Sequence, residues 1–117
     1  MSEADEQYTV CQYLEWRRVP FFAIPNGEKR GPKAQQLFKR LGGKPGVPDL
    51  CVPVAKGGYF GLYIEMKYGR NKPTDNQLRW QSILIEQGYK ATTCWGADEA
   101  IAVIKNYLMR PDTRRES

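Results

Sequence analysis

The segment Gly46–Lys67 constrains the fold of this chain more than any other. Two largely apolar runs, Asp49–Val54 and Tyr59–Lys67, stand on either side of the turn sequence Lys56–Gly58. Apolar runs of this length that flank a glycine turn are typical of an antiparallel β-hairpin. The sequence therefore predicts two neighbouring strands, with an aspartate at the start of the first and a lysine at the end of the second.

Helices and further strands are expected on both sides of this hairpin. Apolar periodicity, capping residues, prolines and glycines predict helices at residues 4–18, 32–41, 75–87 and 98–110, a short buried strand at 21–24, and a strand at 89–95. The order helix, strand, helix, strand, strand, helix, strand, helix predicts an α/β fold, in which helices flank a small mixed sheet. We expect a single domain over residues 1–117, with a disordered tail at 111–117.

The first helix is expected to begin after Ser2, a favourable N-cap residue. Its apolar stripe consists of Val10, Cys11 and Leu14, with Trp16 as a further member, and Glu15 lies at the edge of that stripe. Such an edge faces an adjoining sheet, although a solvated helix position is the plainer interpretation of Glu15.

Histidine is absent from the chain, and this narrows the possible chemistry. Its absence excludes a histidine-activated serine or cysteine nucleophile, a C2H2 zinc site, and nucleases with a histidine general base. Catalysis would have to use carboxylates, lysine, tyrosine or a metal-bound water. The net charge of +5 weakly favours a polyanionic partner.

The expected location is the cytoplasm. The three cysteines are widely spaced within apolar runs, which is typical of buried thiols in a reducing compartment. No apolar run approaches the ~20 residues that cross a bilayer, and the acidic N-terminus does not resemble a signal peptide. We therefore expect no contact with a membrane.

A candidate metal site lies where the two hairpin strands meet. Alternation along a strand places Glu65 and Lys67 on one face, roughly 6–7 Å apart. Antiparallel pairing would bring Asp49 to the same end. Two carboxylates and water suit Mg²⁺, and the backbone carbonyl of Met66 is a natural extra ligand. The plainer interpretation is a solvated strand face on which charges alternate by chance.

The opposite face of the second strand is expected to be an uninterrupted apolar surface that packs on a helix. Its members are Phe60, Leu62, Ile64 and Met66.

The segments GVPDL, YIEMK and TDNQLRWQ resemble the VRR-NUC domain, a branch of the PD-(D/E)xK nuclease superfamily. The resemblance extends from Glu15 to about Leu108, and the order of its motifs makes it specific. It implies a restriction-endonuclease-like core and a nuclease that depends on Mg²⁺ or Mn²⁺. The motif is intact, so the resemblance implies an active enzyme.

The resemblance also implies a role for each motif residue. The metal ligands would be the aspartate and glutamate of the motif and a glutamate of the first helix, which fall on Asp49, Glu65 and Glu15. The motif lysine, Lys67, would position the attacking water. A glutamine of the following helix, Gln77, would support it, although this side chain could instead belong to an exposed helix face.

Compact stand-alone members of this family resemble Holliday junction resolvases and act as homodimers. The resemblance therefore implies an endonuclease that hydrolyses phosphodiester bonds of branched DNA, with a second copy of the chain as its partner. Two-fold symmetry would supply one active site for each of two opposed strands of a four-way junction. The alternatives are a flap or restriction-type nuclease, a non-catalytic nucleic-acid-binding module, and a small structural or partner-binding protein.

Basic residues gather in two segments that are candidates for contact with the DNA backbone. Glycines lie between them, which allows a phosphate backbone to approach closely, and phosphate contacts give affinity with little sequence readout. No helix-turn-helix or zinc-finger pattern is visible, so shape recognition is expected. The candidate DNA-binding residues are Lys29, Arg30, Lys33, Lys39, Arg40, Lys44, Arg70 and Lys72.

Overall fold

The computed structural model describes residues 2–25 and 31–113. In chain order its elements are α1 (Glu3–Trp16), β1 (Phe22–Ala23), α2 (Pro32–Arg40), β2 (Leu50–Val52), β3 (Leu62–Lys67), α3 (Asp75–Glu86), β4 (Lys90–Trp95) and α4 (Ala97–Leu108). This is the order that the sequence predicts, and the α/β class is confirmed.

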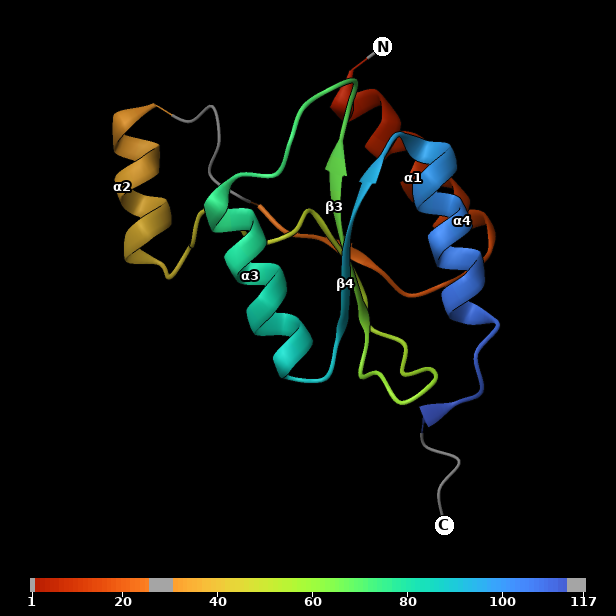
Figure 1. Ribbon diagram of the computed structural model, residues 1–117. Coiled ribbons are helices and arrows are strands. Elements are labelled where there is room, and N and C mark those ends of the chain that lie inside the picture. Colours follow the sequence, from red (N-terminus) through yellow and green to blue (C-terminus); the bar gives the residue numbers. More distant parts are fainter. Residues whose placement is uncertain (1, 26–30, 114–117) are drawn as a thin grey trace.

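The four strands form one mixed sheet in the order β1-β2-β3-β4. The predicted hairpin is confirmed, because β2 and β3 pair antiparallel with Leu50 opposite Ile64. The last strand, β4, pairs parallel to β3 with Trp95 opposite Lys67. Helices α1 and α4 cover one face of the sheet and α3 covers the other (Figure 1).

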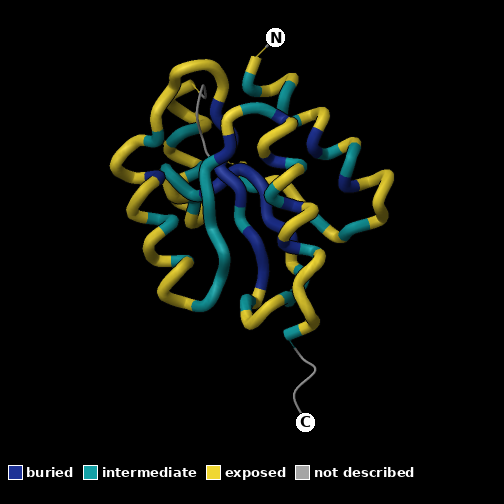
Figure 2. Tube along the Cα trace, turned by 45° about the vertical axis from the view of Figure 1, so that its right-hand side comes forward, coloured by how far each residue is buried: buried dark blue, intermediate teal, exposed yellow. Residues whose placement is uncertain are grey.

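The hydrophobic core lies between the sheet and the pair α1 and α4. The central strands are buried along most of their length (Figure 2). Leu62, Ile64 and Met66 of β3 are fully buried, as expected, because alternation points them at the same helices. Val10 of α1 and Ile104 of α4 pack against them.

Four apolar residues are more exposed than the sequence predicts. Phe22 and Ala23 are both exposed, because β1 is a two-residue strand at the edge of the sheet. Phe60 is exposed because it precedes β3, and its ring contacts Tyr89 instead of the core. Trp16 is exposed because, two residues beyond Leu14, it lies on the opposite side of the helix.

The first turn of α1 is attached to the start of α4. Ser2 is the N-cap of α1, as predicted, because its hydroxyl accepts a hydrogen bond from the Asp5 amide at 3.2 Å. The Glu6 carboxylate accepts a hydrogen bond from the Ala97 amide at 2.8 Å. The Gly96 amide in turn donates to the Lys67 carbonyl at 3.0 Å. The N-terminus of α1 is therefore held beside the carboxyl end of β3 (Figure 1).

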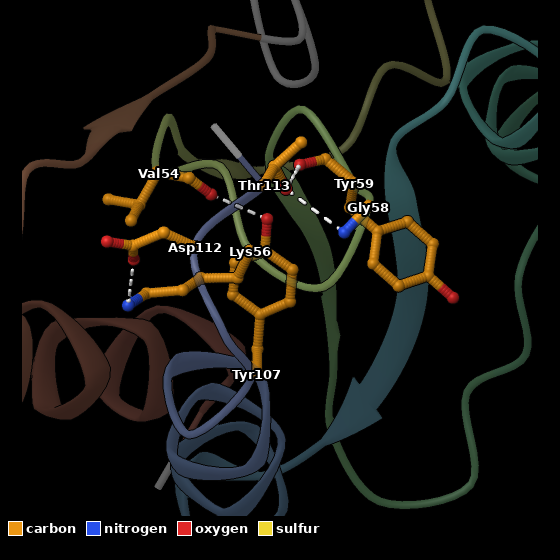
Figure 3. Close-up of polar contacts among 7 residues, drawn as sticks. All are labelled: Val54, Lys56, Gly58, Tyr59, Tyr107, Asp112 and Thr113. Atoms are coloured by element: carbon orange, nitrogen blue, oxygen red, sulfur yellow. Dashed lines mark hydrogen bonds and ion pairs between the residues drawn. The ribbon is translucent and has the colours of Figure 1, made fainter. Parts of the chain in front are cut away.

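Residues 111–113 differ from the expected disordered tail. They lie against the loop that connects β2 to β3 (Figure 3). Asp112 forms an ion pair with Lys56 at 2.7 Å, and the Thr113 hydroxyl donates to the Tyr59 carbonyl at 2.8 Å. The expectation of disorder is therefore wrong for these three positions, and residues 114–117 lie outside the described part of the chain.

None of the helices in the described segments is long and apolar enough to cross a membrane.

Candidate active site at the carboxyl end of β3

The sheet register brings two carboxylates together. Leu50 is opposite Ile64, and extending this register by one residue places Asp49 opposite Glu65 on the same face. Both side chains are buried, with Asp49 6% and Glu65 2% exposed. The Asp49 carboxylate accepts a hydrogen bond from the Met66 amide at 2.7 Å, so its orientation is fixed against β3. The hairpin therefore brings the two carboxylates together in a buried position. The alternative of a solvated strand face with alternating charges is wrong.

Burial dominates the electrostatics of Glu65. The pKa of Glu65 is raised to about 9, mainly by desolvation and further by the charge of Asp49 and a hydrogen bond with it, while the charge of Lys67 acts in the opposite direction. The acid pair therefore retains a proton at neutral pH in the metal-free protein. The Oε1 atom of Glu65 is buried and has no hydrogen-bond partner within the described residues. A cation bound to both carboxylates would provide the partner that this oxygen lacks.

Replacing Glu65 with glutamine, the isostere of the protonated acid, is expected to stabilise the metal-free protein as pH rises. The unfolded chain loses the Glu65 proton above about pH 4.5, whereas the folded protein keeps it until about pH 9. The free energy of unfolding of the wild type therefore falls across this window. In EDTA, we expect Glu65→Gln to melt at least about 4 °C higher than wild type at pH 8, and the difference to shrink at pH 5.

The control for this measurement is Glu15→Gln, which removes an exposed acid. Adding Mg²⁺ should raise the melting temperature of the wild type more than that of Glu65→Gln, since metal binding stabilises the folded state. An equal difference between Glu65→Gln and wild type at pH 5 and pH 8 would contradict the assignment of the buried proton.

Lys67 lies on the same face of β3 as Glu65, two residues further on. It is 8% exposed, although it is the last residue of the strand. Its charge lowers the pKa of Glu65, which places its ammonium group within electrostatic reach of the carboxylate pair. The structure therefore brings together the three side chains of the predicted motif, Asp49, Glu65 and Lys67.

The carbonyl of Met66 lies at the same edge as the carboxylates. The amide and the carbonyl of one residue in a strand point toward the same neighbouring strand. The Met66 amide donates to Asp49, just beyond the end of β2, so the Met66 carbonyl faces this side as well. This is the placement expected of the backbone ligand.

The acid of α1 whose charge reaches the carboxylate pair is Glu3, not Glu15. Glu15 is exposed in the last turn of the helix, about 18 Å from Glu3 along the axis. The charge of Glu3 raises the pKa of Glu65, and the bond from Ala97 to Glu6 holds this turn beside β3. The structure therefore does not bring the predicted Glu15 to the carboxylate pair and places Glu3 at that end of α1 instead. The sequence signal that could have found Glu3 is its position in the acidic turn after the Ser2 cap.

Gln77 is buried, at 7% exposed, but its side-chain carbonyl has a structural role. It accepts a hydrogen bond from the Thr74 amide at 2.9 Å, and the Thr74 hydroxyl accepts one from the Gln77 amide at 3.2 Å. These two bonds form a capping box that begins α3. The alternative of an exposed helix face is therefore wrong for Gln77, whereas its support of Lys67 stays a prediction.

The loop before Asp49 packs against the first turn of α3. Gly46 has φ +94°, and a Cβ atom there would lie 2.6 Å from the backbone carbon of Asn76. A larger residue would therefore be strained and would displace the loop. Pro48, next to Asp49, is fully buried. The loop that orients Asp49 is thus fixed between β3 and α3.

The candidate DNA-binding residues fall into two groups. Arg70 and Lys72 are exposed in the loop directly after β3, close to the site. A second group lies on and after α2, which stands apart from the sheet (Figure 1), and its described members are all exposed: Lys33, Lys39, Arg40 and Lys44. Lys29 and Arg30 lie outside the described residues.

The donor set suits a cation that takes few protein ligands. Among the described residues, no group of three or more His, Cys, Asp or Glu side chains is arranged to hold a metal. Mg²⁺ commonly takes only one or two carboxylates, with waters and substrate phosphate completing the octahedron. The pair Asp49 and Glu65, with its orphaned buried oxygen, fits that requirement.

Comparison with known proteins identifies a family and a similar solved structure. A family model described as the VRR-NUC domain matches residues 1–98. A solved structure described as a VRR_NUC domain protein is 28% identical, and the alignment covers 99% of this chain and 97% of that chain, with a TM-score of 0.81. No curated protein matches the chain.

Proposed function

The chain belongs to the VRR-NUC family, and from that premise we propose that it is a metal-dependent endonuclease that cleaves branched DNA. Membership implies a nuclease-type function. The observation that carries the finer proposal is the meeting of Asp49, Glu65 and Lys67 at one end of β3, with a buried carboxylate oxygen that has no partner in the described residues.

In this proposal the acids and one carbonyl hold the cation, and the lysine acts on water. Asp49, Glu65 and the Met66 carbonyl would bind Mg²⁺ or Mn²⁺, with Glu3 adding negative charge from α1. The cation would supply a water of lowered pKa and would neutralise charge on the phosphate. Lys67 would orient the attacking water and stabilise the negative charge that develops on the phosphate oxygens.

The distribution of basic residues supports a substrate that is recognised by shape. Arg70 and Lys72 flank the site, and α2 carries further cations at a distance from it. Contacts of this kind bind phosphates and read little sequence. A four-way junction offers phosphate backbones in several directions, which suits cations placed on two separate elements.

A homodimer is supported by the exposed apolar residues of α2. Leu37 of α2 is 55% exposed, Leu41, the C-cap residue that follows the helix, is 77% exposed, and none of the residues of α2 is buried. Helices of globular proteins normally bury such a stripe against a partner. A second copy of the chain would cover it and would supply the second active site that paired cleavage of a junction needs. The last helix, α4, is the weaker candidate, because its apolar residues largely pack into the core.

The compartment that we propose is the cytoplasm. Cys11, Cys51 and Cys94 are all free thiols, and the last two are buried. Free thiols persist where glutathione and thioredoxin keep them reduced.

The test is cleavage of a substrate panel: four-way junction, 5′ flap, fork and linear duplex of the same sequence. In Mg²⁺ or Mn²⁺ we expect nicks in opposed strands of the junction, little cleavage of linear duplex, and no cleavage in EDTA. Sedimentation at the same protein concentration should give the mass of two chains. Preference for the flap would identify a flap nuclease. Salt-dependent binding without cleavage of any substrate would instead identify a non-catalytic module.

A further inference from the structure

Trp95 lies beside the catalytic lysine on the same face of the sheet. It is the last residue of β4, and its backbone pairs with Lys67 in the parallel ladder. Neighbouring strands are about 4.8 Å apart, and residues in register share a face. Trp95 is nevertheless 39% exposed, so part of its indole is open to solvent next to the site.

The indole ring is held in one orientation. Its Nε1 donates a hydrogen bond to the Asn71 carbonyl at 2.7 Å. The Trp95 amide donates to the Glu99 carboxylate at 3.2 Å. Asn71 lies between Arg70 and Lys72, so the ring is tied to the basic loop after β3. A ring that is already ordered loses little entropy when it binds a ligand.

An ordered aromatic face beside cations is suited to a nucleic-acid base. Proteins bind unpaired bases by stacking them on aromatic side chains while basic residues follow the backbone. Bases within a duplex are stacked on one another, so their faces are accessible only where the helix is interrupted. A branch point is such an interruption.

We propose that Trp95 is a stacking platform for an unpaired base at the branch point, next to the phosphate that is cleaved. This rests on the proposed nuclease function and specifies which part of the DNA the site selects. Successive phosphates of one strand are about 3.4 Å apart along the axis. The separation of Lys67 and Trp95 therefore corresponds to one or two nucleotides.

The experiment measures binding of two junctions that differ only in their bases. One carries two unpaired nucleotides at the branch point, and the other carries abasic units at the same positions. Fluorescence anisotropy in EDTA gives their affinities without cleavage. We expect wild type to prefer the junction with bases by about 5- to 100-fold, the loss that one missing stacking contact causes. Trp95→Leu should bind the two equally.

Two matched variants separate stacking from a structural role. Trp16→Leu removes another exposed tryptophan, at the far end of α1, and should behave like wild type. Trp95→Phe loses the hydrogen bond to Asn71 but keeps an aromatic ring. Because stacking needs only the ring, this variant should retain the preference for bases. If Trp95→Phe loses the preference, or if wild type shows none, the proposal is overturned, even where metal-dependent cleavage of the junction is observed. Absence of cleavage with the preference intact would contradict the nuclease function instead.

Discussion

Asp49→Asn is expected to reduce the rate of junction cleavage in Mg²⁺ by at least about 10³-fold without loss of thermal stability. Asparagine retains an oxygen that can accept the hydrogen bond from the Met66 amide, so the hairpin geometry is conserved. The negative charge is lost, and with it the capacity to bind a divalent cation jointly with Glu65. The same change removes one cause of the raised pKa of Glu65, so the folded state should be at least as stable as that of wild type at pH 8.

Single-turnover cleavage and thermal melting measure the two effects separately. Lys67→Ala is the companion variant, because it removes the cation and leaves the carboxylate pair in place. It should also abolish turnover while junction binding in EDTA stays close to wild type. Activity within tenfold of wild type for either variant would show that Asp49 and Lys67 do not form the catalytic site.

The hairpin and its charged face could be predicted because both depend on local rules. Alternation along β3 fixes which residues share a face, and the turn between the strands fixes the antiparallel direction. These two facts are sufficient to bring Asp49 to Glu65. The capping box of α3 was equally open to prediction, since Thr74 followed by Gln77 is its sequence pattern.

The position of Glu3 near the carboxylate pair could not be predicted, because it depends on how α1 is placed against the sheet. The periodicity of a helix indicates which stripe is buried but not which end lies beside a given strand. Here the bond between the Glu6 carboxylate and the Ala97 amide joins residues 91 positions apart, and it sets which end of α1 reaches β3. The exposure of β1 has a similar origin, because its place at the sheet edge follows from strand order.

Glu3→Gln is expected to lower junction cleavage by about 10- to 100-fold, whereas Glu15→Gln should remain within twofold of wild type. Both changes remove one negative charge from the same helix, so they alter net charge equally. Glu3 acts on Glu65, whereas Glu15 is exposed about 18 Å away along the helix axis.

Cleavage rates measured over a series of Mg²⁺ concentrations distinguish the origin of this loss. If Glu3 contributes to cation binding, Glu3→Gln should need more Mg²⁺ for half-maximal rate, and saturating Mg²⁺ should restore part of the activity. Glu15→Gln should follow the wild-type curve. The opposite ranking of the two variants would mean that the carboxyl end of α1, and not its amino end, serves the site, and the placement of α1 through Glu6 and Ala97 would then be wrong for the active protein.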